Sequence, residues 1–243
     1  MLSFISLISV ATLLPVSTSP DSLTIFNPNR TYHYRALFIS PTGDTLSQER
    51  ITLRPSGQPW AGQPKRQTAF QIEYHYTPHD SLTFLALPNP KTTRSDKPLP
   101  YWWSRSQHTG AIENRHEIWM HPIRGNQYEY TEVAPFPQVK PDSLRVGGRW
   151  REKPLYILMG WGAFKGKVTP NYQAEKQETR QYGALHLPGC WLIHAVGLHN
   201  KLGESFLDFY FHPSYGFTEM HYRLYDGTRI SFVLEQVVDS RLR

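Results

Sequence analysis

The chain has 243 residues, of which 39% are hydrophobic and 14% aromatic, and its formal net charge is +6. The basic residues are dispersed and no nucleic-acid-binding motif accompanies them, so the charge indicates mild surface steering and no nucleic-acid partner. The single cysteine, Cys190, excludes an internal disulfide, and its apolar neighbours indicate a small buried side chain rather than a nucleophile. Abundant aromatic residues and 20 prolines favour an all-β fold, with room for one short helix.

The first residues have the pattern of a leader. Residues 1–19 carry no charge and combine an apolar run with small residues, Ser17, Thr18 and Ser19, at the spacing of a cleavage site. We interpret this segment as a secretory signal peptide; a buried N-terminal segment is the alternative. The run is shorter than the roughly 20 residues that a membrane-spanning helix needs, and Pro15 interrupts it. We therefore expect residues 20–243 to form one β-rich exported domain, periplasmic or extracellular, without a transmembrane segment.

Alternation of apolar and polar residues marks the strands of the N-terminal half. It predicts a hairpin from residues 32–38 and 45–53, joined by a turn at 40–44. Further along the chain we expect a loop over 55–65, a strand over 70–76 and a short strand over 82–87.

The middle of the chain is less regular. Residues 88–100 form a polar, proline-rich loop that ends near Trp102 and Trp103, which either cap the core or stack on a sugar or peptide. Residues 112–120 fit either a single helical turn or a strand that begins near Glu117. Residues 173–180 fit either a long strand that continues to Leu185 or a short helix.

The C-terminal quarter, residues 189–238, has the clearest pattern, four short strands joined by tight turns. A three-residue turn at 225–227, with Gly227 in the left-handed conformation, sets Met220 opposite Phe232 and Tyr222 opposite Ile230. A four-residue turn at 213–216 precedes it and sets Asp208 opposite His221. Each strand then has one apolar and one polar face, which predicts a curved antiparallel sheet or half-barrel built from meander hairpins.

The chain offers no motif for catalysis. It lacks a nucleophile elbow, a phosphate-binding glycine loop and a dinucleotide fingerprint, so we predict no catalytic residues and no cofactor. His116, Glu117 and His121 lie close in sequence, as do His194 and His199, but neither group has the spacing of a zinc site, and we predict no metal ligands.

The polar face of the C-terminal sheet is the remaining candidate site. It brings together Asp208, Tyr210, His212, Glu219 and His221, which either form a solvated face with cross-strand pairs or bind a ligand. With the two tryptophans of the proline-rich loop, they give the candidate ligand-binding residues Asp208, Tyr210, His212, His221, Trp102 and Trp103.

Short motifs follow one another in the C-terminal half. They are APFP at 134–137, VGGRW at 146–150, LPGCWLI at 187–193, FYFHPSYGF at 209–217, MHY at 220–222 and DG at 226–227. With this order, residues 133–238 resemble a group of exported bacterial β-proteins that includes the TapB-like family and related domains of unknown function. The resemblance implies an extracytoplasmic, curved antiparallel sheet, similar in outline to periplasmic lipoprotein carriers. It carries over no catalytic residues.

Three functions from different classes fit these observations. The first is a non-catalytic exported protein whose concave sheet holds an apolar or glycan-like ligand or docks an envelope protein. The second is a metal-dependent hydrolase that uses the histidines and carboxylates, and the third is a purely structural component of an envelope assembly. The one-faced sheet, the aromatic excess and the missing catalytic spacing favour the first.

Overall fold

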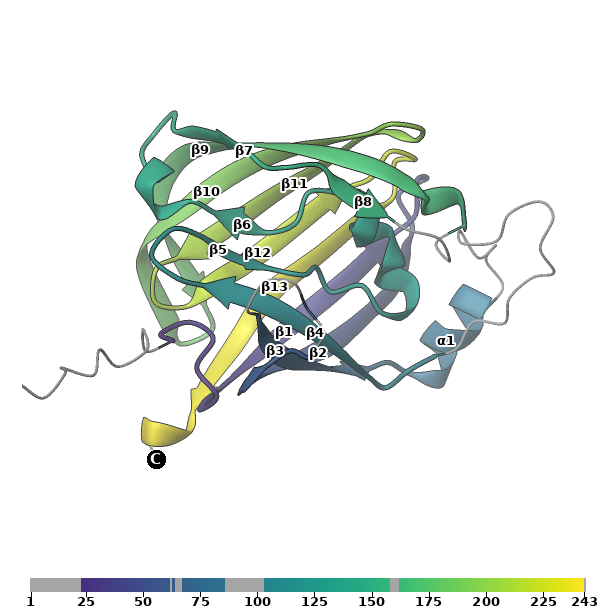
Figure 1. Cartoon of the computed structure of the whole chain (residues 1–243). Coiled ribbons are helices and arrows are strands. Elements are labelled where there is room, and N and C mark those ends of the chain that lie inside the picture. The colour runs from purple at the N-terminus through teal and green to yellow at the C-terminus, as the bar shows by residue number, and fades with distance from the viewer. Residues whose placement is uncertain (1–22, 62, 64–66, 86–102, 158–161, 243) are drawn as a thin grey trace, which may run out of the picture.

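The computed structural model describes residues 23–61, 63, 67–85, 103–157 and 162–242. Within them the strands form one sheet, and a single short α-helix lies beside it (Figure 1). The strands are β1 Arg30–Ile39, β2 Thr45–Pro59, β3 Thr68–His75, β4 Ser106–Glu113, β5 Ile118–Met120, β6 Gln138–Val139, β7 Arg149–Arg151, β8 Leu155–Ile157, β9 Gly166–Tyr182, β10 Leu185–His199, β11 Gly203–His212, β12 Gly216–Arg223 and β13 Arg229–Asp239. The helix is α1 Pro78–Leu85, and the 3₁₀ segments are η1 Asn126–Val133, η2 Pro141–Ser143, η3 Gly162–Phe164 and η4 Ser240–Leu242.

The sheet is antiparallel, in the order β6-β5-β4-β3-β2-β1-β13-β12-β11-β10-β9-β7, with β8 also paired to β9. The first meander runs from β1 to β6 and the second from β9 to β13. They meet where the first strand of the chain, β1, pairs with the last, β13. The sheet curls around a common interior and brings the two ends of this order to the same side, where β5 and β6 lie near β7 and β8 (Figure 1). We call this place the seam. The architecture confirms the predicted curved sheet of meander hairpins.

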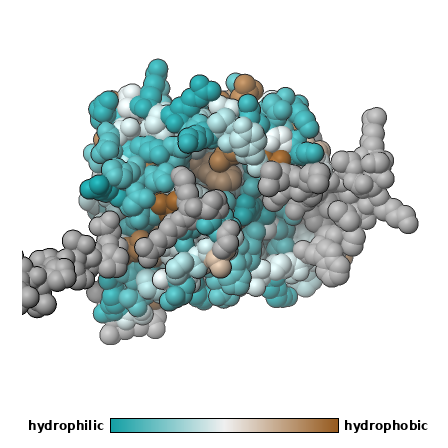
Figure 2. Space-filling view, in the orientation of Figure 1, coloured by the Kyte–Doolittle hydropathy of each residue, from teal (hydrophilic) through white to brown (hydrophobic). Residues whose placement is uncertain are grey.

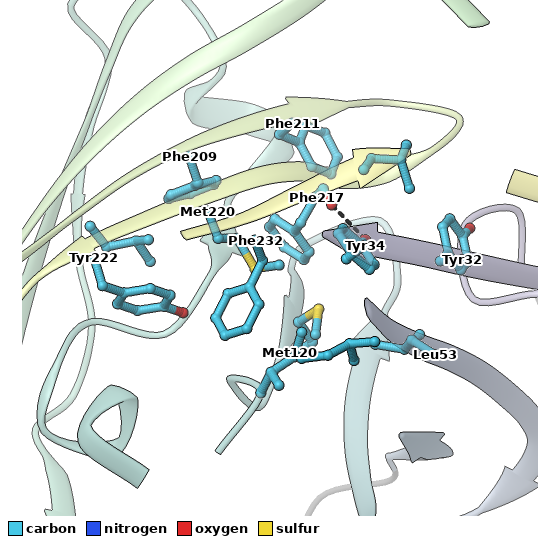
Figure 3. Close-up of a cluster of buried hydrophobic side chains, with 14 of the residues drawn as sticks. Tyr32, Tyr34, Leu53, Met120, Phe209, Phe211, Phe217, Met220, Tyr222 and Phe232 are labelled. Carbon is cyan, nitrogen blue, oxygen red and sulfur yellow. Dashed lines mark hydrogen bonds between the residues drawn. The ribbon is translucent and has the colours of Figure 1, made fainter. Parts of the chain in front are cut away.

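The larger of two apolar clusters among the described residues fills the interior of the curl. Its side chains come from alternate positions of both meanders, which is why the apolar faces of the predicted strands are the buried ones. Figure 3 shows Phe217 of the second meander beside Tyr34 of the first, whose hydroxyl donates to the Phe217 carbonyl at 2.7 Å. Burying each large side chain of this kind contributes about 1.5–3 kcal/mol relative to leaving it exposed.

The two predicted registers of the C-terminal sheet are confirmed. Met220 pairs with Phe232 across a loop of residues 225–227, and Gly227 has a φ of 89°. Asp208 pairs with His221, as expected, but the turn before β12 is one residue shorter than predicted, because Gly216 already pairs with His212. A bulge between β11 and β12, beyond Tyr210, absorbs the difference and keeps the apolar faces aligned.

The prediction of a strand over residues 82–87 is wrong for residues 82–85, which belong to α1; residues 86 and 87 lie outside the described residues. The helix begins at a reciprocal cap: the Asp80 carboxylate accepts a hydrogen bond from the Thr77 backbone N–H at 2.9 Å, and the Thr77 hydroxyl accepts one from the Asp80 N–H at 3.2 Å. The cap provides acceptors for backbone N–H groups at the start of the helix. It therefore favours a helix where the short apolar run fits a strand and a helix equally well.

The loop prediction over residues 55–65 is wrong in its first part. Strand β2 continues to Pro59, with a register shift between Pro55 and Pro59, and the Trp60 N–H donates to the Gln67 carbonyl at 2.8 Å. The shift accommodates prolines that cannot donate to a regular ladder. Of the remaining residues, 62 and 64–66 lie outside the described part of the chain.

Both ambiguous stretches form strands. Residues 112–120 end β4, turn where the Asn114 N–H donates to the Glu117 carbonyl, and continue as β5 from Ile118. Residues 173–180 lie in the long strand β9, which pairs with β10. The proline-rich loop over 88–100 and Trp102 lie outside the described residues. Across the ranges that the structure describes, no helix combines the length and apolarity needed to span a bilayer.

The segment between β5 and β6 crosses the concave side of the sheet. Its Tyr128 is buried, stacks on Tyr74 with ring centroids 6.3 Å apart, and contacts Phe232 edge-on at 5.1 Å. The Tyr128 hydroxyl donates to the buried carboxylate of Glu49 at 2.6 Å. The middle of the concave face is therefore occupied by the chain itself.

Candidate functional site

The polar face of the C-terminal sheet forms an open depression on the outside of the curl. Its volume is about 560 Å³, and it contains three of the candidate residues, Asp208, Tyr210 and His221. Its lining is Glu175, Arg180, Leu192, His194, Asp208, Tyr210, Glu219 and His221. His212 belongs to the next turn, where its Nδ1 accepts a hydrogen bond from the Ser214 N–H at 3.1 Å.

Glu219 is the centre of this outer cluster. Its carboxylate accepts hydrogen bonds from Arg180 Nε at 2.9 Å, the Tyr182 hydroxyl at 2.7 Å and His221 Nε2 at 2.8 Å. Burial alone would raise the pKa of Glu219, but the hydrogen bonds from His221, Tyr182 and Arg180 outweigh it and lower that pKa to about 2. The carboxylate is therefore ionised and fully engaged.

The other candidates in the depression also have partners within the protein. His194 Nδ1 lies 2.5 Å from an Asp208 carboxylate oxygen, and the Tyr210 hydroxyl donates to Glu178 at 2.7 Å. The first pair joins β10 to β11 and the second joins β9 to β11, and such cross-strand pairs stabilise a polar sheet face without a ligand.

His221 lies between Glu219 and Ser231, whose Oγ is 3.0 Å from Nδ1. Serine, histidine and carboxylate in contact are the components of a hydrolase triad. Ser231, however, is inside the sheet, paired with His221 on one side and Leu37 on the other, so the strand ladders use the backbone N–H groups that an oxyanion hole would need. The arrangement is a cross-strand hydrogen-bond ladder.

Trp103 lies away from both the depression and the seam. Its ring contacts Tyr76 edge-on, with centroids 5.1 Å apart, and packs against the core. This contact favours the capping interpretation for Trp103. Trp102 lies outside the described residues.

A second pocket lies at the seam, with a volume of about 290 Å³. We call it the seam pocket, and it is lined by Gln63, Gln67, Glu117, Trp119, His121, Phe136, Gln138, Glu152, Lys153, Pro154, Leu155, Pro170 and Tyr172. These residues come from both ends of the sheet order, so the pocket exists only because the sheet curls. In the orientation of Figure 1, where the seam faces the reader, a small hydrophobic group lies near the middle of a mostly hydrophilic surface (Figure 2).

Two polar contacts join the ends of the sheet beside the pocket. The Tyr172 hydroxyl of β9 donates to the Phe136 carbonyl, which precedes β6, at 3.0 Å. Lys140 Nζ lies 3.2 Å from the Glu117 carboxylate and 2.7 Å from that of Glu152, so one ammonium group bridges the two sides.

A glycine lets the chain reach this position. The segment before β6 crosses β10 at Gly197, where an added Cβ would lie 2.9 Å from Pro135 Cδ and 3.0 Å from Val168 Cγ1. Only a residue without a side chain permits so close an approach of the proline to the sheet.

His121 forms the inner wall of the seam pocket. Aromatic rings surround it, those of Trp60, Trp119 and Phe136, at centroid distances of 5.4, 5.1 and 5.4 Å. Desolvation, with a smaller contribution from the charge of Arg124, lowers the pKa of His121 to about 3, so the ring is neutral. Within the described part of the chain, both ring nitrogens are buried without a hydrogen-bond partner, as is Oε1 of Gln67, a residue only 5% exposed.

The histidines considered for metal binding do not come together. His116 Nε2 accepts a hydrogen bond from Arg115 at 2.9 Å on the surface, whereas His121 is in the aromatic pocket. His199 is buried, with Nε2 3.0 Å from the Phe164 carbonyl, and His194 faces Asp208. In the described ranges no group of three histidine, cysteine or acidic side chains is arranged to hold a metal ion.

Sequence reasoning missed most of the seam pocket. In the sequence, His121 and Glu117 drew attention only as possible metal ligands. Gln67, Phe136 and Tyr172 are too far apart in sequence to suggest a shared site. The one local signal is the proline-flanked Phe136, since prolines around an aromatic residue are typical of an edge strand.

No family model and no curated protein sequence matches the chain. Among solved structures, a candidate lipoprotein from Parabacteroides distasonis is similar with a TM-score of 0.45 and 10% identity, over 88% of this chain and 98% of that one. A LolA superfamily protein from Nitrosomonas europaea is similar with a TM-score of 0.31 and 6% identity, over 86% of this chain and 84% of that one. Both likenesses are too distant to support a functional argument, which rests on the site itself.

Proposed function

We propose that the protein is a non-catalytic binding protein whose seam pocket holds a small ligand, or one end of a larger ligand, through an apolar surface. The observation that carries the proposal is an aromatic-walled pocket in which buried polar atoms have no hydrogen-bond partner among the described residues. Ligand sites usually combine apolar walls with a few polar groups that fix orientation, and about 290 Å³ is near the lower end of their usual volumes.

The outer cluster supports this choice by contrast. Its candidate residues Asp208, Tyr210 and His221 have side-chain partners within the protein, whereas the seam pocket leaves Gln67 and His121 with unused hydrogen-bonding capacity among the described residues. A buried polar atom without a partner costs about 1–3 kcal/mol, a cost that a ligand able to bond with it removes.

A titration with N-phenyl-1-naphthylamine, a neutral apolar dye that fluoresces on leaving water, tests the proposal. We expect saturable binding that is lost in Trp119→Ala, which removes a pocket wall. Trp191→Ala is the matched control, because Trp191 is half-buried on β10 outside the pocket, and it should bind as the natural protein does. Equal dye binding by both variants, or no saturable binding by the natural protein, would contradict the proposal.

Export is a second part of the proposal. The leader-like residues 1–19 and the resemblance of the C-terminal half to exported TapB-like proteins support a periplasmic or extracellular location. The intact mass of the protein recovered from its own cell fraction tests this: we expect a chain that begins at or near Pro20. Recovery of the full-length chain from the cytoplasm would contradict it.

A further inference from the structure

The polar groups of the seam pocket are suited to hydroxyl groups. Gln63, Gln67 and Gln138 line it, and a carboxamide presents both a donor and an acceptor. His121 adds one donor and one acceptor, because its imidazole is neutral. A hydroxyl group also donates and accepts, whereas an acyl chain does neither.

The charges around the pocket balance. Glu117 and Glu152 supply two carboxylates, and Lys140 and Lys153 supply two ammonium groups, with Lys140 bridging both acids. A charged ligand would meet no excess of opposite charge here. The pocket therefore favours an uncharged ligand.

Two residues with unpaired polar atoms, Gln67 and His121, determine which ligand the pocket prefers. Gln67 Oε1 is a buried acceptor that needs a donor, and the two ring nitrogens of His121 need one donor and one acceptor. Beside them the partly exposed Trp119 and the buried Phe136 give the pocket an aromatic wall. A ligand that satisfies both features has hydroxyl groups on its edge and C–H groups on its face.

We propose that the ligand of the seam pocket is an uncharged sugar ring, bound edge-on by Gln67 and His121 and face-on by the aromatic wall. This inference rests on the proposed binding function and specifies its ligand class. A site built to hydrogen-bond hydroxyl groups rejects analogues that lack them, because its own buried groups then stay unpaired.

Saturation-transfer NMR with glucose, galactose and N-acetylglucosamine, beside N-phenyl-1-naphthylamine as the apolar probe, tests the inference. We expect at least one sugar to bind and to compete with the dye. Gln67→Leu should weaken sugar binding by roughly tenfold or more, because a lost buried hydrogen bond has about that effect, and should weaken dye binding less, because the dye has a single N–H group and no hydroxyl. Trp191→Ala, outside the pocket, should leave the binding of both unchanged. His121→Phe, which keeps an aromatic ring and removes both nitrogens, should have the same selective effect and serves if Gln67→Leu does not fold.

The outcomes separate the two proposals. Dye binding at Trp119 without binding of any of these sugars would overturn the sugar inference and leave the binding function in place. Sugar binding that neither Gln67→Leu nor His121→Phe weakens would also overturn the inference, since the sugar would then be bound elsewhere. Absence of both ligands from the pocket would overturn both proposals.

Discussion

Two ionisable side chains, the buried Glu49 and the partly exposed His121, have no partner of opposite charge among the described residues, and desolvation drives both toward the neutral form. For Glu49, desolvation exceeds the effect of the hydrogen bonds from Tyr128 and Gln127 and raises the pKa to about 7. For His121 it lowers the pKa to about 3. Glu219 shows the contrast, because its hydrogen-bond donors hold it ionised despite burial. Donors and charged partners, rather than burial alone, decide the charge of a side chain here.

Acid should destabilise the protein through His121. Between the folded pKa of about 3 and the ordinary value of 6.5, the unfolded chain binds a proton at this residue that the folded chain does not. Stability is then complete above about pH 6.5 and falls with acidification, by up to about 1.4 kcal/mol per pH unit from this group. Urea unfolding from pH 7 to 4.5 should show a shallower decline for His121→Phe, and parallel curves for the two proteins would contradict this account.

The pH dependence of stability that arises from Glu49 has the opposite sign to that from His121. Its folded pKa exceeds the ordinary value of 4.5, so its favourable contribution is present below about pH 4.5 and is lost as pH rises toward 7. Glu49→Gln should therefore gain stability relative to the natural protein as pH increases from 4.5 to 7, by roughly 1 kcal/mol per pH unit. Thermal unfolding of both proteins at pH 5 and 8 measures this. Glu204→Gln, at an exposed position of β11, is the control.

At the scale of the element, turns determine how the strands of the second meander align. Gly227 and Gly216 both have positive φ, and each begins or precedes a strand whose apolar residues must meet those of its neighbour. A change of one residue in the loop would turn the apolar side chains to the opposite face. The bulge beyond Tyr210 shows that the sheet adds an irregularity rather than accept such a change.

Substitution of two glycines by alanine can separate the stability lost through backbone conformation from the stability lost through packing. Gly203 has a φ of 100° and open space around an added Cβ, so Gly203→Ala should cost about 1–2 kcal/mol from conformation alone. Gly216 has a φ of 73°, and an added Cβ would lie 2.5 Å from Ile25 Cγ2, so Gly216→Ala should cost about 1–3 kcal/mol more. Urea midpoints at unchanged slope measure both. Similar losses for the two variants would show that Ile25 can move aside.

At the scale of the whole molecule, the curl closes through side chains rather than strand pairing. The contacts between β9 and the segment before β6, and the Lys140 bridge, hold two ends of the sheet that are remote in the strand order. The pocket between them depends on this closure. Its shape is therefore a property of the complete sheet, which neither meander has by itself.

Removing the Lys140 bridge should loosen the seam more than the protein as a whole. The side chains of this bridge are partly exposed, so Lys140→Met should cost no more than about 1 kcal/mol of global stability. Hydrogen exchange should nevertheless become faster in β6 and β7. These strands lie at the two ends of the sheet order, and the Lys140 bridge helps to hold the two ends together. Lys176→Met, which removes an exposed ion pair with Glu178 on β9, is the matched control. Unchanged exchange at the seam would show that the Tyr172 hydrogen bond is sufficient.

Local order in the chain was enough to predict the first hairpin, the strand over residues 70–76 and the C-terminal strands. The period of two placed Met220 and Phe232 on the same face, and the glycine of a short turn fixed their register, because both are properties of neighbouring residues. The same reasoning found the cross-strand pair of Asp208 and His221 but could not show that their hydrogen bonds are already satisfied. It failed at α1, where the Thr77–Asp80 cap was the decisive signal and the apolar run was ambiguous.

The residues alone predicted the all-β class and, for the C-terminal strands, the apolar face and the pairing of neighbours in the chain. The pairing of the first strand with the last, and the curl that brings Gln67, His121 and Tyr172 into the lining of one pocket, became visible in the three-dimensional fold. The physical reason is the distance along the chain over which each effect acts. Side-chain alternation and turn geometry act over a few residues, whereas the seam results from twist summed over the whole sheet and from a core that both meanders must fill together.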